Sequence, residues 1–240
     1  MPESSEHIVK SYEQELKRLG AMVAEMGGAV ERQVALACEA VLHHDRTAAS
    51  QAMESDPGVD AMERDIEQYV IRLLALRQPM AQDLRQIIAS LKTTGDLERI
   101  GDYAANVAKR SLVVEQFNLR YAASVLTQMA ALVQDNLKRV IDAAGTGDAA
   151  EAMEVWRSDE AIDAIYNALF RELITYMMED PRNISPCTHL LFIAKNLERI
   201  GDHATNIAET VHYAVEGSPL AGKRPKADMS AYSVVRPAGA

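Results

Sequence analysis

The sequence predicts an all-α protein, a tandem repeat of two three-helix bundles related by internal pseudo-symmetry, and three observations favour this fold class. Ala, Leu, Glu, Arg and Met are abundant while aromatic residues make up only 5 % of the 240 residues, a composition that favours helices. No segment shows the sustained apolar–polar alternation of a half-buried strand. The hexapeptide Leu-Glu-Arg-Ile-Gly-Asp occupies residues 97–102 and recurs at residues 197–202.

The repeat extends beyond the hexapeptide, because matching residues keep an offset of 100 after the hexapeptide and an offset of 103 further upstream, and the three-residue difference falls in the turns around Pro79 and Pro181. Chance similarity does not preserve register in this way, so we interpret the chain as a duplicated unit of about 100 residues. We assign the first bundle to residues 1–115 and the second to residues 116–216, and we expect the tail over residues 217–240 to be disordered. The matched pairs are Ala104 with Ala204, Asn106 with Asn206, Ser55-Asp56 with Ser158-Asp159, and Asp45 with Asp148.

In the first unit, Pro and Gly positions divide the helices. The segment from His7 to His43 contains no Pro and predicts the first long helix. Asp56-Pro57-Gly58 predicts a turn that separates a short connecting helix over about 47–54 from a second long helix over Val59–Arg77. The third long helix is expected over residues 81–115.

The second unit repeats this arrangement. A helical stripe of apolar residues extends from Phe117 to Ile141, and Gly145-Thr146-Gly147-Asp148 predicts a break followed by a helix N-cap. Helices are expected near 149–157 and 159–178. After Asp180-Pro181, a last helix is expected to continue to about Glu216.

The charge distribution limits the classes of partner. The formal net charge is −10, and the last 24 residues carry four basic residues against Asp228, a net of +3, so the remainder carries −10 − 3 = −13. Such a body repels nucleic acid and anionic lipid and is better suited to cations or basic protein surfaces. Cys38 and Cys187 form no CxxC motif, so no cysteine-based zinc site is expected. With no signal-peptide pattern and no membrane-spanning stretch, we expect a cytoplasmic protein.

Acidic residues four positions apart recur in both units. Glu98 and Asp102 differ by about 40° around a helix axis, so both carboxylates lie on one face, and Asn106 extends the same column. Leu97, Ile100, Ala104 and Val107 centre on roughly the opposite side of this helix. The same spacing occurs at Asp56 with Asp60, at Asp159 with Asp163, and at Glu198, Asp202 and Asn206.

A solvated acidic face is the ordinary explanation for one such pair, because like charges at this spacing cost only a few tenths of a kcal/mol. Here the pattern occurs on two helices of each unit, so antiparallel neighbours would bring four carboxylates together at each of two sites. Such a cluster is stable when it is protonated, spread apart or neutralised by a cation. Oxygen ligands favour hard cations. Gly101 and Gly201 indicate a close approach to the backbone, and inheritance from one ancestral repeat is the less favoured alternative.

No local pattern indicates a catalytic triad or a Cys/His pair, so we expect no enzyme activity. Glu209-x-x-His212 has the spacing of a di-iron ligand pair, but the first unit has Lys109 and Leu112 at the matching positions. Two alternatives remain open, namely a helical-bundle di-metal redox enzyme or metal store, and a structural scaffold with solvated acidic faces.

Each unit has a Glu-Arg-Ile-Gly-Asp element on its last long helix and an aspartate pair at the start of its middle helix. In this combination the chain resembles the PhoU family of bacterial phosphate-transport accessory proteins. The resemblance covers about residues 7–216 and is specific because the motif occurs twice. It implies divalent or trivalent metal ions (iron, zinc, magnesium or manganese) in multinuclear clusters, one per repeat. The implied ligands are Asp56, Asp60, Glu98, Asp102, Asp159, Asp163, Glu198 and Asp202, with Asn106 and Asn206 as auxiliary ligands.

The resemblance also implies a non-enzymatic adaptor. When phosphate is plentiful, such a protein links the ATPase subunit of the phosphate ABC transporter to a membrane sensor histidine kinase and holds the phosphate-starvation response off. It implies a homodimer that acts in the cytoplasm, or at the inner membrane through its protein partners, in phosphate homeostasis.

Overall fold

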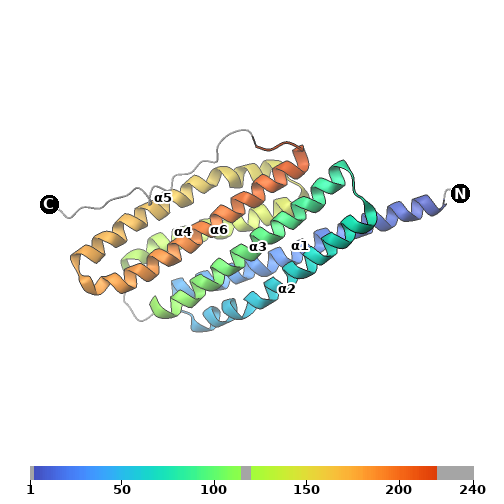
Figure 1. The fold of residues 1–240 in the computed structure, drawn as a ribbon. Coiled ribbons are helices and arrows are strands. Elements are labelled where there is room, and N and C mark those ends of the chain that lie inside the picture. The colour runs from blue at the N-terminus through green and yellow to red at the C-terminus, as the bar shows by residue number, and fades with distance from the viewer. Residues whose placement is uncertain (1–2, 115–119, 221–240) are drawn as a thin grey trace.

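The structure is a computed structural model that describes residues 3–114 and 120–220 (Figure 1). These residues form helices and no strand, which confirms the all-α prediction. The disorder predicted for the tail concerns mainly residues 221–240, which lie outside the described residues. The elements are α1 (Glu3–His43), α2 (Arg46–Arg77), α3 (Ala81–Val114), α4 (Arg120–Thr146), α5 (Ala149–Glu179), the short 3₁₀ helix η1 (Pro181–Asn183) and α6 (Ile184–Glu216).

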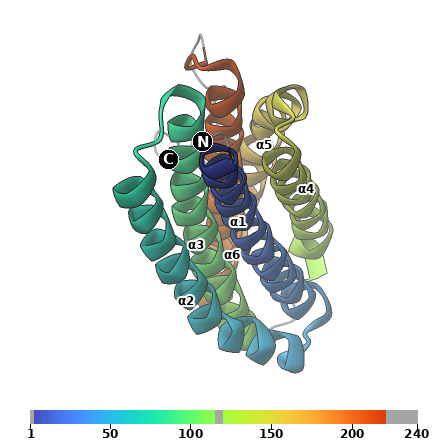
Figure 2. The same ribbon diagram turned by 90° about the vertical axis from the view of Figure 1, so that its right-hand side faces the viewer.

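The long helices form two three-helix bundles, α1–α3 and α4–α6, that lie side by side along their length (Figures 1 and 2). Helices α3 and α6 pack against each other more extensively than any other pair, and α1 also contacts α4. The tandem repeat therefore folds into two equivalent halves that share one long interface. None of the helices in the described residues contains a stretch apolar enough to traverse a lipid bilayer.

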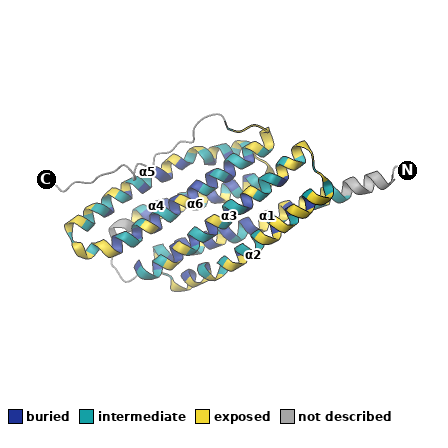
Figure 3. Ribbon diagram, viewed as in Figure 1, coloured by how far each residue is buried: buried dark blue, intermediate teal, exposed yellow. Residues whose placement is uncertain are grey.

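Each helix buries one stripe of apolar residues toward the bundle centres (Figure 3). On α3 this stripe contains Leu97, Ile100, Ala104 and Val107, all at most 1 % exposed, as the sequence pattern predicted. The register of α3 therefore directs Glu98 and Asp102 away from the core of its own bundle and toward its neighbour α2.

The equivalent helices α2 and α5 begin with the same cap. Asp45 accepts hydrogen bonds from the backbone N–H groups of Thr47 and Ala48 at 2.7 and 3.1 Å, and Asp148 accepts two such bonds at 3.0 Å at the start of α5. Gly147, just before Asp148, has a φ of +72°, a conformation that favours glycine. The predicted N-cap at Asp148 is confirmed, and Asp45, its counterpart in the sequence repeat, caps the equivalent helix in the same way.

The turn predicted at Asp56-Pro57-Gly58 is wrong, because α2 continues through it. Pro57 and Gly58 are exposed, whereas Ala52 and Val59 are buried on the inner face of the same helix. Packing of this continuous apolar stripe outweighs the local cost of the proline. The boundary predicted near Ser158 is wrong for the same reason, since α5 is one helix.

Candidate functional site

The acidic residues predicted in the first half face one another across the contact between α2 and α3. Asp56 Oδ1 lies 3.8 Å from the position that a Cβ atom would occupy at Gly101, so α2 reaches the α3 backbone beside Glu98 and Asp102. Burial raises the pKa of Asp56, and the neighbouring charges of Asp102 and Asp60 raise it further. Burial and then Asp102 raise the pKa of Glu98, to which Asp60 also contributes. The structure thus brings the four carboxylates within electrostatic reach of each other.

Glu63 is a fifth carboxylate at this site that the sequence analysis did not identify. It lies on α2 one turn beyond Asp60, and its pKa is raised by burial and by the charges of Glu67 and Asp60. Glu63 in turn raises the pKa of Glu98. We call Asp56, Asp60, Glu63, Glu98 and Asp102 the first acidic cluster.

Gln33 of α1 contacts the first acidic cluster and was not predicted from the sequence. Its fully buried side chain donates hydrogen bonds through Nε2 to the Ala52 carbonyl oxygen at 3.1 Å and to Asp56 Oδ1 at 3.0 Å. These two acceptors fix the orientation of the amide. Its Oε1 has no hydrogen-bond partner and lies 3.0 Å from the Cβ position at Gly101. A buried carbonyl oxygen is therefore left beside the carboxylates.

The second half repeats the arrangement between α5 and α6 but buries it. Asp159 and Asp163 are 2 % exposed, and Glu198 and Asp202 are 4 % and 8 % exposed, so a solvated acidic face does not describe this half. Asp159 Oδ1 lies 3.7 Å from the Cβ position at Gly201, which matches Asp56 and Gly101 in the first half. We call Asp159, Asp163, Glu198 and Asp202 the second acidic cluster.

Glu198 is the most perturbed acid of the second acidic cluster. Burial raises its pKa to about 7, and the charge of Asp202 contributes in the same direction against the hydrogen bond from Lys195. Its Oε2 atom is buried without a hydrogen-bond partner. This oxygen has lost its hydrogen bonds to water and accepts none from the protein, with Arg199 as a more distant charge at 3.9 Å, a condition that a bound cation would relieve.

Basic side chains contact both clusters at the same register. Arg99 lies 3.4 Å from Glu98 Oε2 and 3.2 Å from Asp102 Oδ2, and Arg199 lies 3.9 and 3.6 Å from the equivalent atoms. Both arginines are about half exposed. Lys195 Nζ makes a closer contact of 2.8 Å with Glu198 Oε1.

The two asparagines in the column have different surroundings. Asn106 is exposed and donates from Nδ2 to the backbone oxygen of Asp102 at 2.9 Å. Asn206 donates to Asp96 of α3 at 3.2 Å, and His203 contacts the same Asp96 oxygen at 2.7 Å. Asn206 and His203 therefore join the two halves, a role that helical spacing within α6 did not reveal. The auxiliary-ligand assignment of both asparagines stays a prediction.

The oxygen donors of both clusters fit a hard cation in chemistry, because they are carboxylates, and the first acidic cluster has the unpartnered Oε1 of Gln33 in addition. The clusters are not preassembled, since no three Asp, Glu, His or Cys side chains within residues 3–114 and 120–220 are grouped closely enough to hold an ion. Uptake of an ion therefore requires rotation of these side chains and displacement of Arg99 or Lys195.

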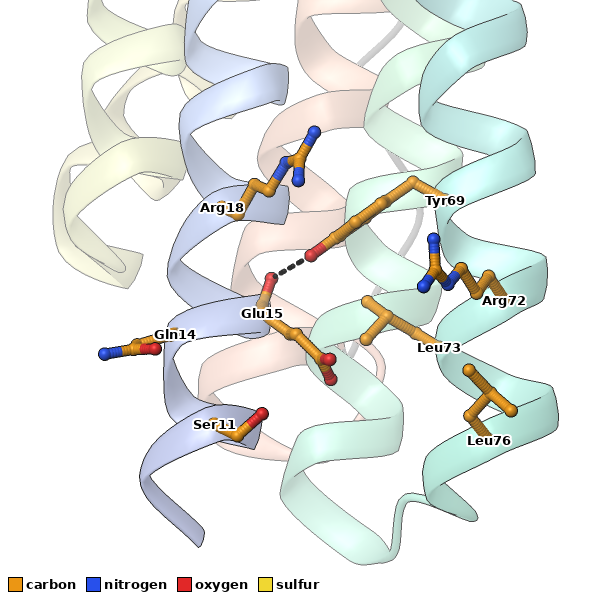
Figure 4. A pocket seen from close by; sticks show the side chains of 8 residues that line it. All are labelled: Ser11, Gln14, Glu15, Arg18, Tyr69, Arg72, Leu73 and Leu76. Atoms are coloured by element: carbon orange, nitrogen blue, oxygen red, sulfur yellow. Dashed lines mark hydrogen bonds between the residues drawn. The ribbon is translucent and has the colours of Figure 1, made fainter. Parts of the chain in front are cut away.

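Two other features do not add to these clusters. Glu209, considered as part of a di-iron pair, accepts a hydrogen bond from Trp156 Nε1 at 2.9 Å. A cleft of about 310 Å³ lies between α1 and α2 (Figure 4), where Tyr69 donates to the backbone oxygen of Glu15 at 3.2 Å and Arg18 lies over the Tyr69 ring. None of the predicted metal ligands lines this cleft. Its lining residues are Ser11, Gln14, Glu15, Arg18, Tyr69, Arg72, Leu73 and Leu76.

Comparison with known proteins agrees with this duplicated architecture. The PhoU domain matches residues 23–111 and again residues 126–211. A phosphate-specific transport system accessory protein PhoU homolog of Caulobacter vibrioides is 50 % identical over 226 residues, 94 % of this chain and 98 % of that protein. The corresponding protein of Rhizobium meliloti is 47 % identical over 228 residues, 95 % of this chain and 96 % of that protein.

Two solved structures share the fold. The crystal structure of PhoU from Pseudomonas aeruginosa superimposes with a TM-score of 0.84 at 41 % identity, covering 86 % of this chain and 100 % of that chain. The crystal structure of the phosphate transport system regulatory protein PhoU from Streptococcus pneumoniae gives a TM-score of 0.80 at 31 % identity, covering 88 % of this chain and 99 % of that chain. Two matched domains and relatives aligned over nearly their whole length show that this chain belongs to the PhoU family.

Proposed function

We propose that this protein is a metal-binding, non-enzymatic adaptor that represses the phosphate-starvation response and modulates phosphate uptake. The observation that carries the metal-binding part is the convergence of carboxylates from neighbouring helices at the same register in both halves. Burial raises the pKa of Asp56, Glu98 and Glu198, so the neighbouring groups do not fully offset the cost of removing these carboxylates from water. A structural scaffold needs no such group of partly buried acids, which supports a site that receives a cation.

The groups that would hold the cation are the side-chain oxygens of the two acidic clusters. A divalent or trivalent ion (iron, zinc, magnesium or manganese) would neutralise the facing carboxylates and link α2 to α3 or α5 to α6. Gly101 and Gly201 keep the neighbouring helices close enough for acids from both to reach one ion, because a side chain at either position would contact the opposite helix or Gln33. In this proposal, metal occupancy rigidifies each helix pair and thereby the surface that partners bind.

The regulatory part of the proposal is supported by what similar proteins are named for. The Caulobacter vibrioides relative is an accessory protein of phosphate-specific transport, and the Streptococcus pneumoniae structure is a regulatory protein of phosphate transport. We place this chain, as a homodimer in the cytoplasm, in contact with the transporter ATPase subunit and a sensor histidine kinase. A net charge of −10 supports basic protein surfaces as partners over nucleic acid.

Metal uptake can be tested by removing two carboxylates of the first acidic cluster. In chelator-treated protein, we expect Glu98→Gln combined with Asp102→Asn to weaken Mn²⁺ binding in equilibrium dialysis at least tenfold, because two coupled donors are lost. A matched control, Asp135→Asn with Asp142→Asn, removes the same charge from exposed positions on α4 and should bind Mn²⁺ as the unmodified protein does. Equal binding by both double variants would contradict the metal site.

The regulatory role needs a separate readout in the native bacterium. Deletion of the gene should raise expression from a phosphate-starvation promoter at high phosphate, and the unmodified gene should restore repression. The Glu98→Gln, Asp102→Asn variant should restore it only partly if metal occupancy shapes the partner surface. Unchanged expression in the deletion strain would refute the regulatory proposal without affecting the metal site.

A further inference from the structure

The two acidic clusters are equivalent by symmetry but differ at two matched positions. At the offset of 103 residues, Glu63 on α2 corresponds to Tyr166 on α5. At the offset of 100 residues, Gly95 on α3 corresponds to Lys195 on α6. The first acidic cluster therefore has an additional carboxylate where the second has a phenol ring, and it has no side chain where the second has an ammonium group.

Lys195 is fixed inside the second acidic cluster by two contacts. Its Nζ lies 2.8 Å from Glu198 Oε1 and 4.9 Å from the centre of the Tyr166 ring. The Glu198 side chain is 5 % exposed and that of Lys195 is 29 % exposed, so solvent screens this ion pair little. The ring and the carboxylate together hold an ammonium group where a metal ion would neutralise the same acid.

The first acidic cluster has no equivalent internal cation. Among the described residues, Asp56, Asp60 and Glu63 form no ion pair, and the pairs to Glu98 and Asp102 come from Arg99, whose side chain is 59 % exposed. An exposed arginine is held weakly and can turn into solvent. The unpartnered Oε1 of buried Gln33 adds a neutral oxygen donor on the inner side of this cluster.

Building on the proposed function, we propose that the two clusters are unequal: the first acidic cluster takes up the exchangeable divalent cation, and the Lys195 ammonium is a built-in counter-ion that keeps the second acidic cluster closed to it. The carboxylates of the first cluster have only the exposed Arg99 as a counter-charge, so an external ion competes with a side chain that is weakly held. In the second cluster an ion must first displace Lys195 from Glu198 and from Tyr166. Lys195 is thus a specificity-determining residue of this half.

Exchanging the residues at the matched positions tests the proposal. Gly95→Lys introduces an ammonium group beside the first acidic cluster, and the space around Gly95 is open, with no atom within 4 Å of its Cβ position. We expect this variant to bind Mn²⁺ at least tenfold more weakly, while Gly95→Ala, which adds no charge, binds as the unmodified protein does. Lys195→Gln removes the counter-ion and should add a second class of Mn²⁺ sites with at least tenfold tighter binding than the unmodified protein shows in this half.

Dialysis with Mn²⁺ alone on the full chain, with far-ultraviolet circular dichroism as a folding control, separates the possible results. The double variant Glu98→Gln, Asp102→Asn should lose the tight Mn²⁺ binding of the unmodified protein. The double variant Glu198→Gln, Asp202→Asn should keep this tight Mn²⁺ binding. Equal losses from both double variants, with no effect of Gly95→Lys or Lys195→Gln, would overturn the inequality and leave metal binding standing. Absence of Mn²⁺ binding by the unmodified protein would overturn the proposed function itself.

Discussion

Gly101 and Gly201 show how a single atom sets the distance between helices. A Cβ atom at Gly201 would lie 2.8 Å from Ile162 Cδ1, and Ile162 is itself fully buried. A Cβ atom at Gly101 would lie 3.0 Å from Gln33 Oε1. The close approach that the sequence indicated at both glycines is confirmed, and it explains why each half retains a residue that costs about 1 kcal/mol within a helix.

We therefore expect alanine to have opposite effects at an open glycine and at a packed glycine of these equivalent helices. Gly95→Ala meets no atom within 4 Å and should raise the free energy of unfolding by about 0.5–1 kcal/mol through helix propensity. Gly201→Ala gains the same propensity but compresses Ile162, a type of overpacking that costs about 1–3 kcal/mol, so it should destabilise the protein overall. Urea denaturation of the two variants measures both effects, and stabilisation by Gly201→Ala would contradict the packing seen here.

The sequence alone predicted much of the candidate site at this scale, and it failed where contacts between helices decide. Helical spacing placed Glu98 and Asp102 on one face, and the duplication identified the corresponding acids of the second half. Gln33, Glu63 and Lys195 were missed because the rotation of each helix about its axis determines which side chains meet across an interface. A usable signal did exist for Gln33, which matches Asn136 at the offset of 103 residues within an otherwise apolar stripe.

At the scale of an element, α2 shows that packing can outweigh a strong local signal. Pro57 lacks the N–H that would bond one turn back, and the equivalent residue in α5 is Glu160. Ala52 and Val59 are buried on either side of this point, so the helix is held by its inner face while Pro57 lies on the exposed face. Sequence reasoning cannot weigh these two effects because the burial of the inner face depends on α1 and α3.

Replacing this proline should therefore stabilise α2 without changing its path. Pro57→Ala restores the missing backbone donor at an exposed position, and we expect the free energy of unfolding to rise by about 1–3 kcal/mol. Pro79 lies between α2 and α3, outside any helix. Pro79→Ala should therefore lower the free energy of unfolding by about 0.4–1 kcal/mol, because alanine gives the unfolded chain more conformational entropy than proline does. Urea denaturation followed by ellipticity compares the two, and a loss of stability in Pro57→Ala would show that the proline is required by the helix.

At the scale of the whole molecule, the interface between α3 and α6 joins the two repeats. Asp96 of α3 contacts His203 at 2.7 Å and accepts a hydrogen bond from Asn206 at 3.2 Å, and the ring of Tyr103 lies 5.6 Å from that of His203. Near one end of the same interface Arg110 lies over the ring of Phe192 at 4.2 Å. Because these contacts lie between the halves, loss of one half removes partners from the other.

We therefore expect the two repeats to unfold together. The chain contains one tryptophan, Trp156, which is hydrogen-bonded to Glu209 within the second half, so its fluorescence reports on that half alone, whereas ellipticity reports on all the helices. In urea, both signals should give the same midpoint in the unmodified protein, as a cooperative transition requires. Asp96→Ala removes the contacts to His203 and Asn206 and should lower that shared midpoint by an amount equivalent to about 1–3 kcal/mol. Separate midpoints in the unmodified protein would mean that each three-helix bundle is stable alone, and the long interface between α3 and α6 would then contribute little to holding the acidic clusters of the two halves in one rigid body.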